Sequence, residues 1–138
     1  MSEKMSQKEE MEQLVSLLKQ WQELEVEGIA FLNELQAQTE NPVLKETLEI
    51  IKQDSGQHRR VQQFLVDGLT KEAFSLNIEE VAQVWEKLEE HDKLEEQAIA
   101  MANKARKNTK SAVVRYFLNY LLADEEKPAR RIGFFERL

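Results

Sequence analysis

The sequence contains no cysteine, and this absence excludes several kinds of site. Without thiols, these residues can form no disulfide bond, no thiolate metal site, no iron–sulfur centre and no cysteine nucleophile. A metal or catalytic site in this chain must therefore use other side chains.

Glycine and proline are also scarce, with 4 and 2 respectively in 138 residues. Sheets and turn-rich folds use both more often, whereas Glu, Lys, Leu, Gln and Ala, which recur here, favour long helices. With 41% hydrophobic and 33% charged residues, the chain is too apolar to be disordered and can bury one modest core. We expect a single all-α domain over residues 1–138.

An excess of positive charge and long apolar runs are missing too. The formal net charge is -7, whereas nucleic acid and acidic membrane both require a cationic face, so neither partner is expected. The stretch MSEKMSQKEEMEQ at residues 1–13 lacks the apolar core of a signal peptide, and no later apolar run approaches membrane-spanning length. We therefore expect a cytoplasmic protein.

Capping residues predict a helical hairpin over about residues 6–68. Ser6, followed by Glu9, is a capping box that begins the first helix, which ends near residues 36–41. Asn41 followed by proline begins the second helix, which fades near residues 67–68.

A second hairpin is predicted over about residues 77–137. Asn77 with Glu80 begins the third helix, and the turn KNTK at residues 107–110 precedes the fourth. Pro128 removes a backbone donor within the fourth helix, so we expect a kink there, followed by resumed helix with Phe135 packed beside Trp85.

An internal repeat relates the two hairpins. A shift of 70 residues places LEVEGIAFLN (24–33) on LEEQAIAMAN (94–103), Leu48 on Leu118 and Asp54 on Asp124. A shared amphipathic pattern alone can also make two hairpins similar, but the repeat favours a four-helix bundle built from a duplicated hairpin.

The inward seam of this bundle is interrupted by a polar layer. Heptad spacing places Glu25 in the first helix, Ser55 and His58 in the second, Glu95 in the third and Glu125 in the fourth on the seam. Within each hairpin, these positions lie at similar distances from the turn, so they are expected at one height. Buried carboxylates without partners cost several kcal/mol each, so a compensating group is expected.

This layer resembles the ligand pattern of the ferritin-like di-iron carboxylate bundles, of which rubrerythrins are a branch. The family's pattern is Glu, then Glu-x-x-His, then the same pair again. Here it reads Glu25, Ser55-Gly-Gln-His58, Glu95 and Glu125-Glu-Lys-Pro128, and LLADEEK at residues 121–127 also resembles the family's fourth helix. Ser55 replaces a bridging carboxylate and Pro128 replaces a histidine, so a complete di-iron centre is not expected.

The matching positions are Glu25, His58, Glu95 and Glu125, which suit one iron, manganese or zinc ion. The resemblance implies a metal-binding protein that reacts with oxygen or peroxide, although no catalytic residue can be assigned. The alternative is a metal-free bundle, in which His58 hydrogen-bonds to Glu25 or Glu125 and fixes helix register, acting as an interaction or assembly module. His91 is either a displaced second nitrogen ligand or a partly exposed seam histidine.

The connection between the second and third helices leaves the topology of the bundle open. A ferritin-like crossover between the second and third helices runs the length of the bundle, about 40 Å, whereas the roughly ten residues between Asp67 and Asn77 reach about 35 Å. Either these helices are shorter than their caps suggest or the bundle runs up, down, up, down. The ligand pattern favours the ferritin-like topology. Surface apolar residues such as Phe134, together with acidic faces, favour a homodimer.

Overall fold

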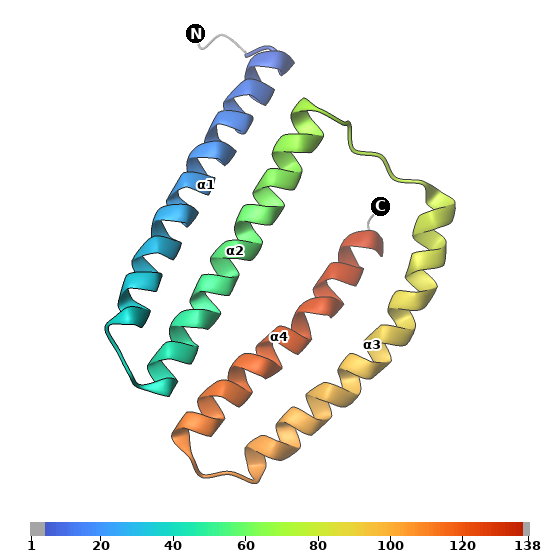
Figure 1. The fold of residues 1–138 in the computed structure, drawn as a ribbon. Coiled ribbons are helices and arrows are strands. Elements are labelled where there is room, and N and C mark those ends of the chain that lie inside the picture. Colours follow the sequence, from blue (N-terminus) through green and yellow to red (C-terminus); the bar gives the residue numbers. More distant parts are fainter. Residues whose placement is uncertain (1–4, 137–138) are drawn as a thin grey trace. The chain divides into compact units, whose positions relative to one another are not determined.

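The computed structural model describes the backbone of residues 5–136 and the side chains of residues 5–125. Four α-helices cover this part of the chain, which contains no strand (Figure 1). They are α1 (Gln7–Ala37), α2 (Pro42–Thr70), α3 (Ile78–Lys107) and α4 (Ala112–Glu136). The prediction of an all-α protein is confirmed, and its helices form two compact units, Met1–Phe74 and Ser75–Leu138.

In the first unit, α1 packs along α2 as a helical hairpin (Figure 1). The Ser6 side chain accepts a hydrogen bond from the Glu9 amide, which confirms the predicted start of α1. The Asn41 side chain accepts from the amides of Val43 and Leu44, and proline fills the first position of α2. These contacts satisfy amide groups that have no partner within the helix itself.

In the second unit, α3 packs along α4 in the same way. The Asn77 side chain accepts from the amides of Glu79 and Glu80, which confirms the predicted start of α3. The α4 backbone remains helical to Glu136, so the predicted continuation of the helix beyond Pro128 is confirmed. The predicted contact between Phe135 and Trp85 lies outside the described side chains.

The two turns repeat the same hydrogen bonds at the 70-residue interval found in the sequence. The Asn41 amide donates to Thr39 Oγ1 over 3.1 Å, and the Ser111 amide donates to Thr109 Oγ1 over 3.2 Å. The side chains of Asn41 and Ser111 also each accept a hydrogen bond from the backbone amide three residues later. The two hairpins are therefore similar in local geometry as well as in sequence.

The helix face that contacts the partner helix also repeats. In α1 a partner-facing row, spaced alternately by three and four residues, is half-buried or buried: Val15, Leu18, Gln22, Glu25, Ile29, Leu32 and Gln36. The row 70 residues later in α3 is half-buried throughout: Trp85, Leu88, Asp92, Glu95, Ile99, Ala102 and Arg106. Alternating three- and four-residue spacing keeps one face of a helix toward its neighbour.

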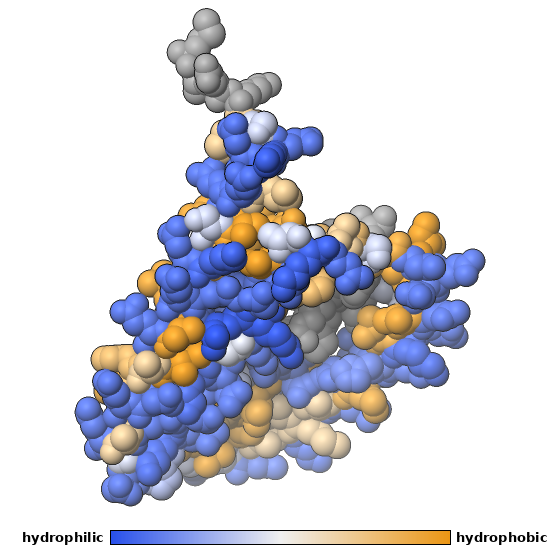
Figure 2. Space-filling view, turned by 45° about the horizontal axis from the view of Figure 1, so that its top comes forward, coloured by the Kyte–Doolittle hydropathy of each residue, from blue (hydrophilic) through white to orange (hydrophobic). Residues whose placement is uncertain are grey.

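Few apolar side chains are fully buried. Among the described residues these are Leu18 and Val66. Leu14 and Trp21, which share the heptad spacing of Leu18 and Glu25, are about half exposed. Apolar side chains accordingly reach the surface between hydrophilic ones (Figure 2). The reason is geometric: within a hairpin a helix covers only the row that faces its partner, so the rest of a broad apolar face stays exposed.

Seven residues, 71–77, connect α2 with α3. The ring of Phe74 packs on α2, with its centroid 5.4 Å from that of Phe64, and it lies where a side chain on Gly68 would be. The first part of the connection is thus held against the first hairpin. No helix in the described part of the chain has a stretch long and apolar enough to cross a membrane.

Candidate metal centre

Glu25 and His58 form a carboxylate–imidazole pair between the two helices of the first hairpin. His58 Nδ1 lies 3.2 Å from Glu25 Oε1. The Glu25 side chain is only 14% exposed, whereas that of His58 is 56% exposed. One edge of the imidazole therefore contacts a largely buried carboxylate, while the rest of the ring remains accessible.

Glu95 and His91 form a second pair, within α3 of the other hairpin. His91 Nε2 lies 3.2 Å from Glu95 Oε1, and the Glu95 side chain is 17% exposed. The second carboxylate oxygen, Glu95 Oε2, is buried and has no hydrogen-bond partner among the side chains that the structure describes. Each pair contains a half-buried glutamate, and the two glutamates are equivalent in the 70-residue repeat. The two histidines are not equivalent, because His58 lies on α2 and His91 on α3.

The remaining layer residues occupy equivalent positions in the second helix of each hairpin. Ser55 in α2 and Glu125 in α4 are both half-buried and are 70 residues apart. The structure thus brings Glu25 together with His58, and leaves Glu95 and Glu125 in the other unit. Within residues 5–125 it places no group of three or more His, Asp or Glu side chains that could hold a metal ion.

The geometry of the pairs nevertheless fits shared metal coordination. Metal–nitrogen and metal–oxygen bonds of about 2.0–2.2 Å, at angles of about 90–110°, separate two neighbouring ligand atoms by roughly 3.0–3.5 Å. The observed separation of 3.2 Å in each pair falls in this range. Since the same distance also suits a hydrogen bond, each pair can serve as two metal ligands or as a metal-free polar contact.

A polar ladder between α1 and α2 lies closer to the turn and was not predicted from the sequence. Lys52 Nζ donates to Asn33 Oδ1 and to Gln36 Oε1, while Gln36 Nε2 donates to Glu49 Oε2 over 3.0 Å. Hydrogen bonds from Gln36, Lys52 and Gln53 lower the pKa of Glu49 from 4.5 to about 2. The polar residues at 33 and 36, and again at 49 and 52, are a signal in the sequence that could have identified this ladder.

Gln62 of α2 is a buried polar residue that shares the heptad spacing of Ser55 and His58. Only 3% of this residue is exposed, and its side-chain amide has no hydrogen-bond partner within the described part of the chain. An unpaired buried amide costs roughly 1–3 kcal/mol. Because Gln62 follows His58 by one helical turn, polar character continues along α2 beyond the Glu25–His58 pair.

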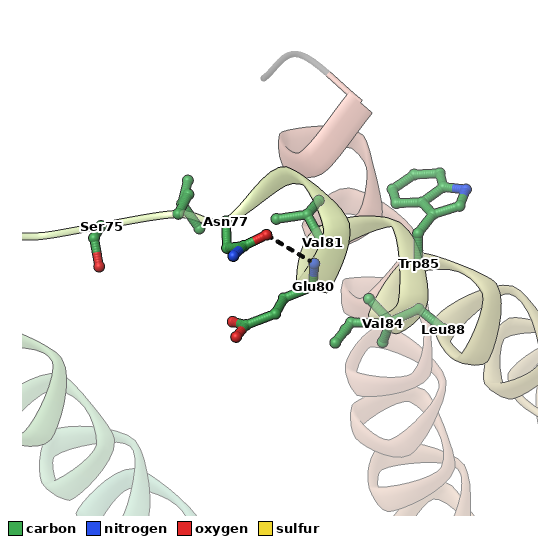
Figure 3. Close-up of a pocket in the computed structure, with 8 residues that line it drawn as sticks. Ser75, Asn77, Glu80, Val81, Val84, Trp85 and Leu88 are labelled. Carbon is green, nitrogen blue, oxygen red and sulfur yellow. Dashed lines mark hydrogen bonds between the residues drawn. The ribbon is translucent and has the colours of Figure 1, made fainter.

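A small hollow lies at the start of α3, before the His91–Glu95 pair on the same helix. It has a volume of about 200 Å³ and is lined by residues of the second unit, including Val81, Val84, Trp85 and Leu88 (Figure 3). Asn77 caps the helix beside it, through the bond to the Glu80 amide drawn in Figure 3. Its mostly apolar lining suits helix packing rather than metal binding.

Searches for related proteins found no match to the chain among protein-family models, curated protein sequences or solved structures.

Proposed function

We propose that this protein binds a single iron, manganese or zinc ion through Glu25, His58, Glu95 and Glu125, as a ferritin-like protein of the rubrerythrin type with an altered metal site. The observation that carries the proposal is the Glu25–His58 pair. Two helices bring a largely buried carboxylate and an accessible imidazole within 3.2 Å, a separation that suits two ligands of one ion.

The proposed site depends on assembly of the two hairpins into the four-helix bundle expected from the sequence. In that bundle His58 supplies the nitrogen ligand, and the three carboxylates neutralise the charge of a divalent ion. The buried, unpaired Glu95 Oε2 supports this arrangement, since a metal ion would compensate an otherwise costly oxygen. A bound iron or manganese ion would supply reactivity toward oxygen or peroxide.

The proposed likeness to ferritin-like proteins concerns the ligand pattern and not the helix connection. A lengthwise crossover must span a helix such as α2, whose 29 residues extend about 43 Å. The seven residues between α2 and α3 reach only about 28 Å when fully extended. The proposal therefore applies to a bundle whose second and third helices are joined by a short connection.

Metal analysis of the full chain, purified without a histidine tag, tests this function. We expect about one equivalent of metal per chain after loading with Fe²⁺, Mn²⁺ or Zn²⁺, and loss of that metal in His58→Ala and Glu25→Gln. Gln57→Ala, at the exposed position beside His58, is the matched control and should retain the metal. Equal metal content in the His58→Ala and unaltered proteins would contradict the proposal.

A second candidate function, an assembly module, is favoured by an exposed apolar row on α1. Leu17, Leu24 and Phe31 recur every seven residues and are 55%, 65% and 61% exposed. Heptad spacing of this kind suits packing against another helix. We propose that this outer row pairs with the same row of a second copy, giving a homodimer.

Light-scattering mass measurements can test the dimer. Leu24→Glu places a charge in the outer row and should convert a dimer into a monomer at micromolar concentration. Val26→Glu adds the same charge at another exposed apolar position, about 200° around the helix from Leu24, and should leave the mass unchanged. A monomeric mass for the unaltered chain at high concentration would rule out this assembly.

A further inference from the structure

The His91–Glu95 pair has no counterpart in the ferritin-like ligand pattern. The two residues are four apart on α3, so they lie on one face of the helix, with His91 Nε2 3.2 Å from Glu95 Oε1. About half of the imidazole is exposed, while the carboxylate is largely buried. The separation is the same as in the Glu25–His58 pair, and it suits two ligands of one ion.

The internal repeat places the two histidines at positions that do not correspond to each other. Under the 70-residue shift His58 corresponds to Pro128, which has no nitrogen that could bind a metal, and His91 corresponds to Trp21. Glu25 and Glu95 correspond to each other. Each hairpin therefore carries one imidazole beside its equivalent glutamate, although the imidazole reaches the glutamate from a different position.

The unpaired oxygen of Glu95 supplies an independent argument. Glu95 Oε2 is buried without a partner in the described part of the chain, so the interaction with His91 accounts for only one of the two carboxylate oxygens. A buried carboxylate with an unsatisfied oxygen is costly unless a proton, a donor or a cation compensates it. A cation held jointly with His91 would meet this requirement.

We propose that His91 and Glu95 form a chelating pair for a divalent transition-metal ion, with His91 supplying the nitrogen that Pro128 cannot. This inference rests on the proposed metal-binding function and assigns metal binding to a second imidazole. A second nitrogen ligand favours Zn²⁺ or Fe²⁺ over Mg²⁺ and Ca²⁺, which prefer oxygen ligands.

Zinc titration of the ¹⁵N-labelled full chain, followed through the imidazole nitrogen resonances, tests the pair directly and needs no variant. We expect Zn²⁺ to shift one ring nitrogen of His91 as well as one of His58. A shift of His58 alone would overturn the His91 inference and leave the proposed function standing. Unchanged resonances of both histidines would overturn both.

Variants supply the second measurement, with Zn²⁺ affinity determined by competition against a chelator. His91→Ala should weaken binding by at least about tenfold. Glu96→Gln, which neutralises the exposed carboxylate next to Glu95, should bind as the unaltered chain does. Equal weakening by both substitutions would show a general charge effect and overturn the chelating pair.

Discussion

At the residue scale, the packing of Phe74 on Gly68 shows how one missing side chain positions the connection between the hairpins. A Cβ atom on Gly68 would overlap the ring of Phe74, which also contacts Phe64. By contrast, a Cβ atom on Gly56 would meet nothing within 4 Å, although Gly56 also lies in α2. The two glycines therefore predict opposite effects of the same substitution.

We expect Gly68→Ala to lower the free energy of unfolding by about 1–3 kcal/mol, because the Phe74 ring must move. Gly56→Ala should raise it by about 0.5–1 kcal/mol, because alanine favours the helix and meets no obstacle. Urea unfolding measures both changes. In a Phe74→Ala background Gly68→Ala should no longer destabilise, and a persistent loss would contradict the packing argument.

The hydrogen bonds of Glu49 predict a dependence of stability on pH. Because the folded pKa of Glu49, about 2, lies below its ordinary value of 4.5, its contribution is full above about pH 4.5 and is lost as the pH falls toward 2. The unfolding free energy of the unaltered chain should therefore fall more steeply over this range than that of Glu49→Gln. Glu46→Gln removes an exposed carboxylate one turn earlier and should keep the steeper slope.

At the scale of elements, the two turns are built by the same cap geometry, which predicts matching effects of substitution. Asn41→Ala and Ser111→Ala each remove a side chain that accepts from the amide three residues later. Each should cost about 1 kcal/mol of stability, measured by urea unfolding.

The double variant Asn41→Ala/Ser111→Ala supplies the check on this prediction. Since the two caps lie in different compact units and share no partner, their effects should add within about 0.5 kcal/mol. Ser16→Ala, in the interior of α1, is the control and should change stability by less than about 0.5 kcal/mol. A loss of unfolding free energy in only one of the two single variants would show that the two caps do not stabilise their turns equally.

At the scale of the whole molecule, the exposed apolar faces predict that neither hairpin is stable alone. Two long helices gain most of their stability from packing, yet the described part of the chain has only two fully buried apolar side chains, Leu18 and Val66. Fragments 1–74 and 75–138 should each show low helicity by circular dichroism, and mixing them should restore it. High, cooperative helicity in either isolated fragment would contradict this prediction.

Much of the local structure could be predicted from the sequence, because it depends on neighbouring residues. Ser6, Asn41 and Asn77 cap the helices they were expected to cap, since a cap needs only a side chain and amides two or three positions away. The contact between His58 and Glu25 was one of the expected alternatives and is present. The predicted four-ligand metal site stays a prediction, as do the homodimer and the expected compartment.

The sequence by itself determined the all-α class, the four helices, their caps and the 70-residue repeat, because these follow from local propensity and periodicity. Only the tertiary structure decided which part of each apolar face meets a partner. Heptad spacing indicated one seam through Leu14, Leu18, Trp21 and Glu25. Contact with α2 buries Leu18 and half-buries Glu25, whereas Leu14 and Trp21 stay about half exposed. The polar ladder of Gln36 and Glu49 likewise depends on the register of two packed helices. Register is set by side-chain fit across the interface, and periodicity along a single helix cannot specify it.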